Sequence, residues 1–439
     1  MNQTIIYNPR CETLSRDELE QLQIERLQSA LNRAYRNVAF YRTAFDRNKV
    51  NLEKIKQIRD LRALPFTTRK DLQNSYPYDM FAVPLRDIVR IHSAPSAADK
   101  PVVVGYTRND LKNWTECVAR QLAAVGVTEH DVVQIALDYH LFAGAFGFHQ
   151  GAEQIGASVI PASLTANVEK QILIMKDYKT TVLISTPSHA ANLAAALEKL
   201  QIHPERLQWR LGIFGGERWS SAFRRRLEQQ LQIDTTDTYG LTEVMGPGVA
   251  GECYVRQGLH VNEDHFIVEV IDPRRLEPVE PGEEGELVIT TITREGIPLI
   301  RYRTGDITSL DRQPCPCGRT FLRMAGVRGR TDDLILFRGL SFFPAQIEAI
   351  LAQHVGASPH YQIILDRQDG ADTLEIRLEV PKNLPFLDEI KTLENLQMQL
   401  SQNLKVALEA ETKITFVEPR SLQNVMEGAG RVIDKRLGE

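Results

Sequence analysis

The sequence has no apolar run long enough to cross a membrane. A spanning helix needs about 20 consecutive apolar residues, and stretches such as Thr181–Ser185 are far shorter. The N-terminal segment Met1–Asp17 also lacks the apolar centre of a signal peptide. We therefore expect a soluble, cytoplasmic protein.

Long basic runs are absent and cysteines are few. The 439 residues hold 52 Lys and Arg against 57 Asp and Glu, and the net charge of −5 argues against nucleic acid as the main partner. Five cysteines, an odd number in so long a chain, favour a reducing compartment over a disulfide framework. The 27 Gly and 21 Pro are spread along the chain, which excludes a collagen-like or disordered protein. The composition is that of an ordinary globular protein.

Helix-like and strand-like segments alternate through the first half of the chain. Such alternation is typical of parallel strands joined by crossover helices. The expected strands are Val102–Tyr106, Val132–Leu137, Ser158–Ile160, Thr181–Ile184, Leu211–Phe214 and Asp234–Thr238, and the expected helices are Asn109–Val125, Phe142–Ile155, Val168–Tyr178 and Ala222–Gln230. A further helix is predicted over Ser15–Asn48, with Ser15 and Glu18 as a capping box.

A smaller antiparallel region is predicted further along the chain. Phe266–Ile271 and Gly285–Thr291 are rich in β-forming residues and flank the turn-forming pair Pro281-Gly282.

The last part of the chain follows a β-α-β-β-α-β pattern. The expected strands are Leu334–Phe337, Tyr361–Leu365, Leu374–Val380 and Lys413–Val417, and the expected helices are Pro344–His354 and Leu387–Leu408. The predicted fold is therefore α/β. A large N-terminal domain over residues 1–331 has mainly parallel sheet plus a small β-region, and a mobile small α+β domain covers residues 332–439.

Four motifs carry the chemistry. Tyr239-Gly240-Leu241-Thr242-Glu243 combines a glycine that admits a ligand close to the backbone with a hydroxyl and with a carboxylate suited to Mg²⁺. Arg301–Asp306 ends in a carboxylate able to accept hydrogen bonds from two ribose hydroxyls. Gly329–Asp332 lies at the predicted domain junction, and the glycines of Gly215–Glu217 would let a flat ring lie against the backbone.

Each motif alone is also typical of an ordinary loop or solvated turn. In this order, however, they resemble the adenylate-forming superfamily of acyl-CoA synthetases, and most closely the phenylacetate–CoA ligase family. The stretches that carry the resemblance are Asn8-Pro9, Asn37–Tyr41, Leu64–Thr67, Tyr239–Val249, Gly258–His265 and Phe343–Glu348. The resemblance covers essentially the whole chain.

The resemblance implies a two-step reaction and a homodimer. A carboxylate attacks the α-phosphate of ATP, which gives an acyl-adenylate and pyrophosphate, and CoA then displaces AMP. The matching positions assign Glu243 to Mg²⁺, Thr242 and Lys100 to phosphate, Asp306 to the ribose, Arg330 to the nucleotide, and Gly215, Gly216, Glu217, Tyr239 and Gly240 to the adenine site. They also assign the hinge to Asp332 and the pantetheine tunnel to Arg338 and Gly339.

Two departures from the family's pattern concern the activation step. The family's phosphate loop is rich in Ser, Thr and Gly, whereas Ser93–Pro101 has no glycine, contains Pro95 and places Asp99 where pyrophosphate would lie. Near the C-terminus, Ala429 stands where the family has a lysine that stabilises the adenylation transition state. Loss of one such contact costs roughly 10²–10³-fold in rate.

Two enzymatic interpretations stay open. The first is a ligase that joins an aromatic carboxylate to CoA. The second is a non-adenylating member of the family that passes an aryl-acyl group from a preformed acyl-CoA or acyl-adenylate to a carrier-protein thiol or another nucleophile. A non-catalytic scaffold is a third interpretation, and the retained Thr242, Glu243 and Asp306 argue against it.

A metal site and an acyl pocket complete the predicted site. Cys253, His260, Cys315 and Cys317 have the spacing C-x6-H…C-x-C, which is typical of a closed structural Zn²⁺ site. Free buried cysteines are the alternative, and His265 is an alternative ligand.

Ligands gather at strand ends in open parallel sheets. Tyr139, Phe142 and Phe146 follow such an end and predict a pocket for a flat aromatic acid, floored by Gly215 and Gly240. Plain core aromatics are the alternative.

Overall fold

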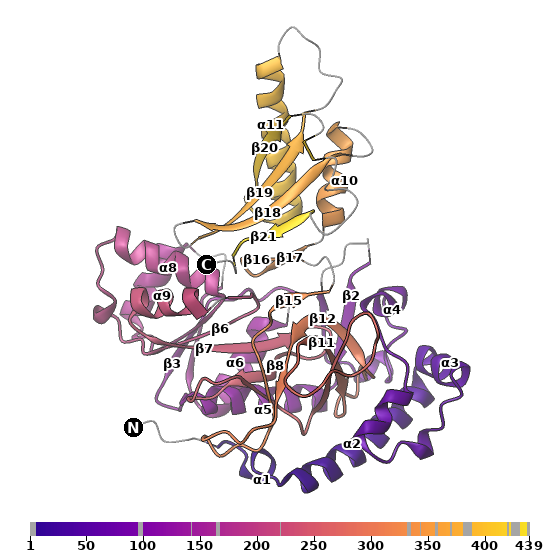
Figure 1. The fold of residues 1–439 in the computed structure, drawn as a ribbon. Helices are drawn as coiled ribbons and strands as arrows, with labels where there is room; N and C mark the ends of the chain where they lie inside the picture. The colour runs from indigo at the N-terminus through magenta and orange to yellow at the C-terminus, as the bar shows by residue number, and fades with distance from the viewer. Residues whose placement is uncertain are drawn as a thin grey trace. The chain divides into compact units, whose positions relative to one another are not determined.

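The computed structural model folds into two compact units, coloured along the chain in Figure 1. It describes residues 6–94, 100–141, 143–163, 167–219, 221–331, 335–342, 344–355, 359–368, 371–380, 389–418, 421–422 and 431–436. The first unit comprises Met1–Ser185, Ile202–Gly216 and Gln232–Asp332, and the second comprises Thr186–Gln201, Glu217–Leu231 and Asp333–Glu439. The division into domains at residue 331 stays a prediction.

A nine-stranded sheet forms the centre of the first unit (Figure 1). Its order is β13 (Leu310–Asp311), β14 (Arg323–Met324), β9 (Leu259–Val261), β8 (Gly246–Glu252), β7 (Asp234–Leu241), β6 (Leu211–Gly215), β5 (Val182–Ser185), β3 (Val132–Ile135) and β4 (Ser158–Pro161). The strands from β7 to β4 are parallel, whereas β8, β9, β14 and β13 continue the sheet in antiparallel pairs. The predicted α/β fold is confirmed.

Helices α6 (Gly144–Ile155) and α7 (Val168–Asp177) connect parallel strands, as predicted. Helix α5 (Arg108–Ala124) instead joins Val102–Tyr106 to β3, and Val102–Tyr106 pairs antiparallel with Arg90–Ala94 outside the nine-stranded sheet, so the prediction that it belongs to the parallel strands was wrong. α5 and α6 pack closely because Gly151 has no side chain. A Cβ atom there would lie 2.6 Å from Cγ1 of Val118.

The second unit contains the predicted helix α9 (Ser221–Leu231) and also α8 (Pro187–Lys199), which the sequence patterns do not predict. The buried residues Ala190, Leu193, Ala194 and Leu197 of α8 recur at helical spacing, so the sequence did contain a signal for this helix.

A second sheet of four antiparallel strands confirms the predicted β-rich region. Its order is β10 (Phe266–Ile271), β11 (Gly285–Thr291), β12 (Tyr302–Thr308) and β15 (Gly329–Arg330). A separate hairpin of β1 (Arg90–Ala94) and β2 (Val102–Tyr106) flanks the segment predicted to bind phosphate. Of that segment, residues 95–99 lie outside the described part of the chain.

The C-terminal part of the second unit is a small α+β fold, as predicted. Its sheet has the order β20 (Lys413–Val417), β19 (Ala371–Glu379), β18 (Tyr361–Gln368) and β21 (Val432–Asp434), and its helices are α10 (Pro344–Val355) and α11 (Glu389–Leu408). A hairpin of β16 (Ile335–Phe337) and β17 (Leu340–Phe342) precedes them. Leu351, Ile363, Ile376 and Leu404 are fully buried between these layers. β21 was not expected from the sequence.

The N-terminal helices correct one prediction. The stretch predicted as one helix over Ser15–Asn48 is two helices, α2 (Arg16–Asn37) and α3 (Ala39–Arg47), because Val38 is extended with φ −114° and ψ 113°. The turn at Val38 lets both Val38 and Phe45 be buried. The predicted capping box is confirmed, since the Ser15 hydroxyl accepts from the Glu18 amide and Ser15 N–H donates to the Glu18 carboxylate at 2.9 Å.

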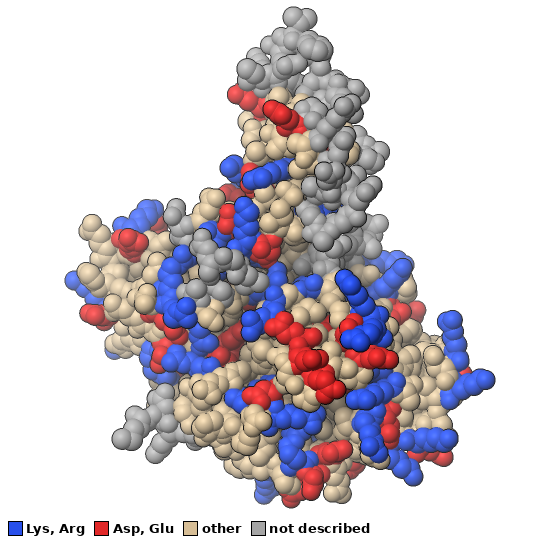
Figure 2. All heavy atoms as spheres, viewed as in Figure 1, with Lys and Arg blue, Asp and Glu red and all other residues tan. Residues whose placement is uncertain are grey.

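Charged side chains of both signs are interspersed on the face drawn in Figure 2.

Short helices complete the described chain. The short helices are α1 (Pro9–Glu12), α4 (Arg69–Asn74), and the 3₁₀ turns η1 (Leu52–Lys54), η2 (Ile58–Ala63), η3 (Leu85–Asp87) and η4 (Pro204–Arg206). Among the described helices, none has both the length and the apolar character required to span a bilayer.

Buried ion pairs connect distant segments of the first unit. The Glu12 carboxylate accepts from Arg319 at 2.6 Å, and both side chains are buried. Asp264 accepts from Arg120 at 2.7 Å and lies 3.3 Å from Nε2 of His265. Burial lowers the pKa of His265 to about 4, although the Asp264 carboxylate opposes this shift.

The buried, neutral His265 makes stability depend on pH. The unfolded histidine takes up a proton near pH 6.5, but the folded one does so only near pH 4. The unfolded state therefore binds more protons between these values, and the free energy of unfolding should fall by up to ~3 kcal/mol as the pH drops from about 6.5 to 4.

Urea unfolding at pH 7.0, 5.5 and 4.5 measures this effect. His265→Gln should show a shallower loss of stability than the wild type, whereas the exposed His140→Gln should not differ from it. Equal slopes for the wild type and His265→Gln would contradict the assignment.

Candidate nucleotide and acyl site

The predicted central motif begins inside a strand rather than after one. β7 continues to Leu241, so Tyr239 and Gly240 are strand residues, and the pairing of β7 with β8 shifts register between them. Gly240 faces Gly246 so closely that a Cβ atom would lie 1.8 Å from the Gly246 carbonyl oxygen. Only glycine fits at this position, because any side chain would collide with the paired strand β8.

Thr242 and Glu243 lie in the tight turn between β7 and β8. Thr242 is half-buried, and the Glu243 side chain is almost completely buried. The amides of Val244 and Met245 both donate to the Leu241 carbonyl, at 3.1 and 3.0 Å. The turn therefore presents a hydroxyl and a carboxylate on consecutive residues.

Buried donors from other elements hold the carbonyl groups of this turn. Arg294 donates to the Val244 carbonyl at 2.8 Å, and the Tyr106 hydroxyl donates to the Met245 carbonyl at 2.8 Å. The Arg294 guanidinium also lies over the Tyr106 ring, 4.4 Å from its centroid. The backbone on the C-terminal side of Glu243 is thus fixed.

The Glu243 carboxylate is ion-paired with Arg69 of α4. Thr68 and Asp71 form a capping box at the start of this helix, which fixes the backbone next to Arg69. The sequence motifs do not indicate Arg69, although it comes two residues after the Leu64–Thr67 stretch of the family resemblance.

The cavity next to Glu243 is small and mostly apolar. Its volume is about 10 Å³, and its lining includes Leu72, Met80 and Val104. A cavity of this size holds one water at most, whereas Mg²⁺ usually keeps several waters in an octahedral shell. Among the described residues, this cavity has no room for the predicted hydrated Mg²⁺.

Asp306 forms a buried cluster with two of the other predicted nucleotide residues, Tyr239 and Arg330. The Tyr239 hydroxyl donates a hydrogen bond of 2.7 Å to one carboxylate oxygen of Asp306, and Arg330 forms an ion pair with the other oxygen. Arg330 reaches it because β15 pairs with β12 at the position of Asp306. Burial, and then the Asp306 charge, raise the pKa of Tyr239 well above its usual value, so its hydroxyl stays protonated.

The other residues predicted for nucleotide or phosphate binding do not join this cluster through any side-chain hydrogen bond or ion pair between described residues. Gly215 ends β6 and packs against β7, where a Cβ atom would lie 2.5 Å from the Thr238 carbonyl oxygen. Gly216 follows with φ +76° and open space around it. Lys100 is exposed. Glu217 belongs to the second unit, where it is buried and accepts from Ser188 at 2.7 Å.

Two of the three predicted acyl-pocket aromatics contact each other. The Tyr139 and Phe146 rings meet edge-to-face with centroids 5.2 Å apart, and both residues are half-buried. The buried His92 lies 5.4 Å from the Phe146 ring. Phe142 lies outside the described residues.

The predicted tunnel and hinge residues belong to the last part of the chain. Arg338 and Gly339 form the tight turn between β16 and β17, with φ values of +49° and +78°. Arg338 also donates to the Asp372 carbonyl at 2.5 Å. The predicted hinge residue Asp332 is outside the described residues.

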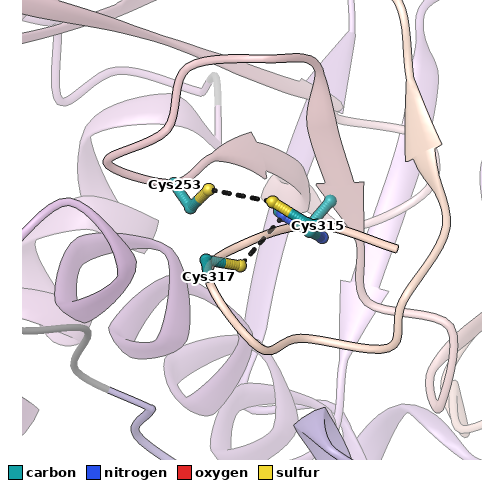
Figure 3. A group of neighbouring side chains, drawn as sticks. Cys253, Cys315 and Cys317 are labelled. Atoms are coloured by element: carbon teal, nitrogen blue, oxygen red, sulfur yellow. Dashed lines mark hydrogen bonds between the residues drawn. The ribbon is translucent and has the colours of Figure 1, made fainter. Parts of the chain in front are cut away.

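The four predicted metal ligands converge at one point of the first unit, and Figure 3 labels the three cysteines among them. Their ligand atoms all lie within 4.8 Å of one another, and all four residues are buried. Cys253 follows β8, His260 is in β9, and Cys315 and Cys317 lie in the loop before β14. The loop returns to the other two ligands because Arg323 of β14 pairs with His260.

Hydrogen bonds orient the side chains of this cluster. Nδ1 of His260 donates to the Phe321 carbonyl at 3.2 Å, which leaves Nε2 facing the Cys317 sulfur at 3.5 Å. The Cys253 and Cys315 sulfurs are 3.8 Å apart, too far for a disulfide. A hydrogen bond from the Cys253 thiol lowers the pKa of Cys317. His265, the alternative ligand, instead contacts Thr293 at 2.8 Å.

Comparisons with known proteins agree with these observations. The family model for AMP-binding enzymes matches residues 99–293, and that for the AMP-binding enzyme C-terminal domain matches residues 339–436. Phenylacetate-coenzyme A ligase of Thermus thermophilus is 39% identical over 98% of this chain and 100% of its own length, and that of Escherichia coli K12 is 40% identical over 97% of each chain. The chain belongs to the phenylacetate-coenzyme A ligase family.

This membership confirms the resemblance to adenylate-forming enzymes. A solved structure of 2-hydroxyisobutyryl-CoA ligase with 2-HIB-AMP and CoA has a TM-score of 0.89 and 26% identity, and the match covers 97% of this chain and 91% of that one. The protein is thus of the acid–CoA ligase type. The individual roles of the site residues stay predictions.

Gly240→Ala tests the packing around the central motif. Because the new Cβ would meet the Gly246 carbonyl at 1.8 Å, we expect a loss of unfolding free energy of at least ~3 kcal/mol, at the upper end of overpacking costs. Gly329→Ala is the matched control, since no atom lies within 4 Å of the position that its new methyl group would take. Thermal melts of both variants measure the difference, and similar melting temperatures would refute the packing role.

Proposed function

We propose that this protein forms the CoA thioester of an aromatic carboxylic acid from an acyl-adenylate, and that its own ATP-dependent activation step is slow. The observation that carries the proposal is the buried Tyr239–Asp306–Arg330 cluster in a chain about 40% identical to phenylacetate-coenzyme A ligases. The relatives' substrate suggests the aromatic acid.

Different site residues would bind the nucleotide and the acyl group. The Asp306 carboxylate, positioned by Tyr239 and Arg330, would accept hydrogen bonds from the ribose hydroxyls. Thr242 offers its hydroxyl to the phosphate, and Tyr139 with Phe146 flanks the aromatic ring. In thioester formation the thiol sulfur of CoA attacks the acyl carbonyl carbon, the carbon–oxygen bond to AMP breaks, and AMP leaves with the electron pair.

The slow activation step follows from the two departures in sequence. Asp99 and Pro95 replace the small, donor-rich residues of a phosphate loop, and Ala429 replaces the lysine that would stabilise the developing charge. Both changes concern pyrophosphate and the adenylation transition state. Neither concerns the ribose, the acyl group or the thiol.

The same departures favour a second candidate function. The protein would then receive an aryl-acyl group as a preformed acyl-CoA or acyl-adenylate and pass it to a carrier-protein thiol. The two functions share the acyl pocket and differ in the acceptor. A homodimer, a hinge at Asp332 and a tunnel lined by Arg338 and Gly339 are further parts of the proposal.

Pyrophosphate release from ATP with a panel of aromatic acids tests the activation step. We expect release near background, together with thioester formation when synthetic phenylacetyl-adenylate and CoA are supplied. Ala429→Lys alone should recover little, and joining it to a glycine-containing phosphate loop should recover more than the product of the two separate effects.

The outcomes separate the candidates. Acid-dependent turnover of ATP at ~1 per second or faster by the wild type would refute slow activation and leave an ordinary ligase. Transfer from the adenylate to a carrier-protein thiol, with none to CoA, would favour the second function.

The cluster of Cys253, His260, Cys315 and Cys317 is proposed to hold one structural Zn²⁺. Three thiolates and one imidazole make a closed tetrahedral set with no position for substrate. The ion would connect the strand that follows the Glu243 turn to the loop before β14. It supplies folding stability rather than chemistry to the reaction.

Metal analysis of protein purified without chelator should find one zinc per chain. Cys317→Ser should lose the metal and melt at a lower temperature, because structural zinc contributes directly to folding. Cys11→Ser is the matched control, since this half-buried thiol lies outside the cluster and its loss should leave the zinc content at one. Wild-type protein without zinc would contradict the assignment.

A further inference from the structure

The ion pair between Arg69 and Glu243 has no place in the proposed reaction. Both side chains are largely buried, with 17% and 5% of their surfaces exposed. A guanidinium stays protonated at every physiological pH, so Arg69 is a permanent positive charge at this carboxylate. The family resemblance places a metal cation at the same carboxylate.

The backbone next to Glu243 has little freedom to move. The carbonyls of the next two residues accept from Arg294 and Tyr106, both at 2.8 Å, and all of these groups are buried. Moving the turn would leave these donors without acceptors inside the protein, which is costly. The backbone at Glu243 is therefore held in place, and the ion pair with Arg69 directs the carboxylate toward α4.

Among the described residues, the cavity that Glu243 lines also leaves little space for a second cation. The adjacent cavity of about 10 Å³ is lined mainly by apolar side chains such as Leu72 and Met80. A hydrated divalent ion needs several oxygen ligands at close range. It would also meet the like charge of the guanidinium in a poorly solvated place, where repulsion is strong.

We infer that Arg69 is the resident cation of Glu243 and excludes a divalent metal ion from this carboxylate. Arg69 is thus a positioning residue that neutralises Glu243 and holds its side chain. The inference is independent of the acid and the acyl acceptor, because it concerns metal binding in the absence of substrate.

Binding of Mn²⁺ alone, followed by electron paramagnetic resonance of the free ion, tests the inference on the full-length, zinc-loaded protein. Wild type and Glu243→Gln should give the same binding curve, because Glu243 holds no metal. Arg69→Gln should gain one Mn²⁺ site at least tenfold tighter than any in the wild type. The double variant Arg69→Gln/Glu243→Gln should lose that site again.

Two matched variants separate the ion pair from general charge effects. Arg69→Lys keeps the cation and should bind Mn²⁺ like the wild type. Lys70→Gln removes the same charge from the exposed neighbouring residue and should also leave binding unchanged.

Three results would overturn the inference. These are a Mn²⁺ site in the wild type that Glu243→Gln abolishes, equal binding by wild type and Arg69→Gln, and a new site in Arg69→Gln that persists in the double variant. The first comparison needs no change at Arg69, so it stays decisive if Arg69→Gln fails to fold.

Discussion

The geometry of the site depends on buried donors that hold the turn between β7 and β8. Arg294 lies between β11 and β12, and Tyr106 ends β2, yet both donate to carbonyl groups next to Glu243. Removing a partner from a buried polar group costs about 1–3 kcal/mol, so the turn, the hairpin and the second sheet hold one another in place. The side chains of Thr242 and Glu243 take their positions from this arrangement.

Both carboxylates of the site are neutralised within the protein. Asp306 pairs with Arg330, and Glu243 pairs with Arg69. Desolvating a carboxylate costs several kcal/mol unless a partner compensates, which explains why each is accompanied by an arginine. A bound nucleotide then meets a site that is close to neutral at these two positions rather than one with two bare negative charges.

The sequence correctly predicted those features of the fold and the site that depend on local sequence patterns. Helix and strand alternation identified the parallel part of the sheet, and the spacing of Cys253, His260, Cys315 and Cys317 identified four residues that do converge. Patterns failed where a tertiary contact decides the outcome. Val38 breaks a helix that its neighbours favour, because the break buries Val38 and Phe45.

The sequence motifs could not predict contacts between segments that are distant in the chain. The strand β8 is rich in glycine and has low β propensity, but its pairing with β7 stabilises it. Arg69 follows a recognisable stretch, yet no spacing rule connects it to a carboxylate 174 residues later. Such pairs become visible only when the sheets bring the segments together.

The pairing of Glu12 with Arg319 has a consequence for synthesis of the chain. These partners are 307 residues apart, and a ribosome adding about 5–20 residues per second needs roughly 15–60 s to pass from one to the other. Glu12 therefore lacks its arginine partner until most of the first unit has been synthesised. The loop that supplies Arg319 also carries Cys315 and Cys317, so the first and last parts of this unit are joined at the same late moment of translation.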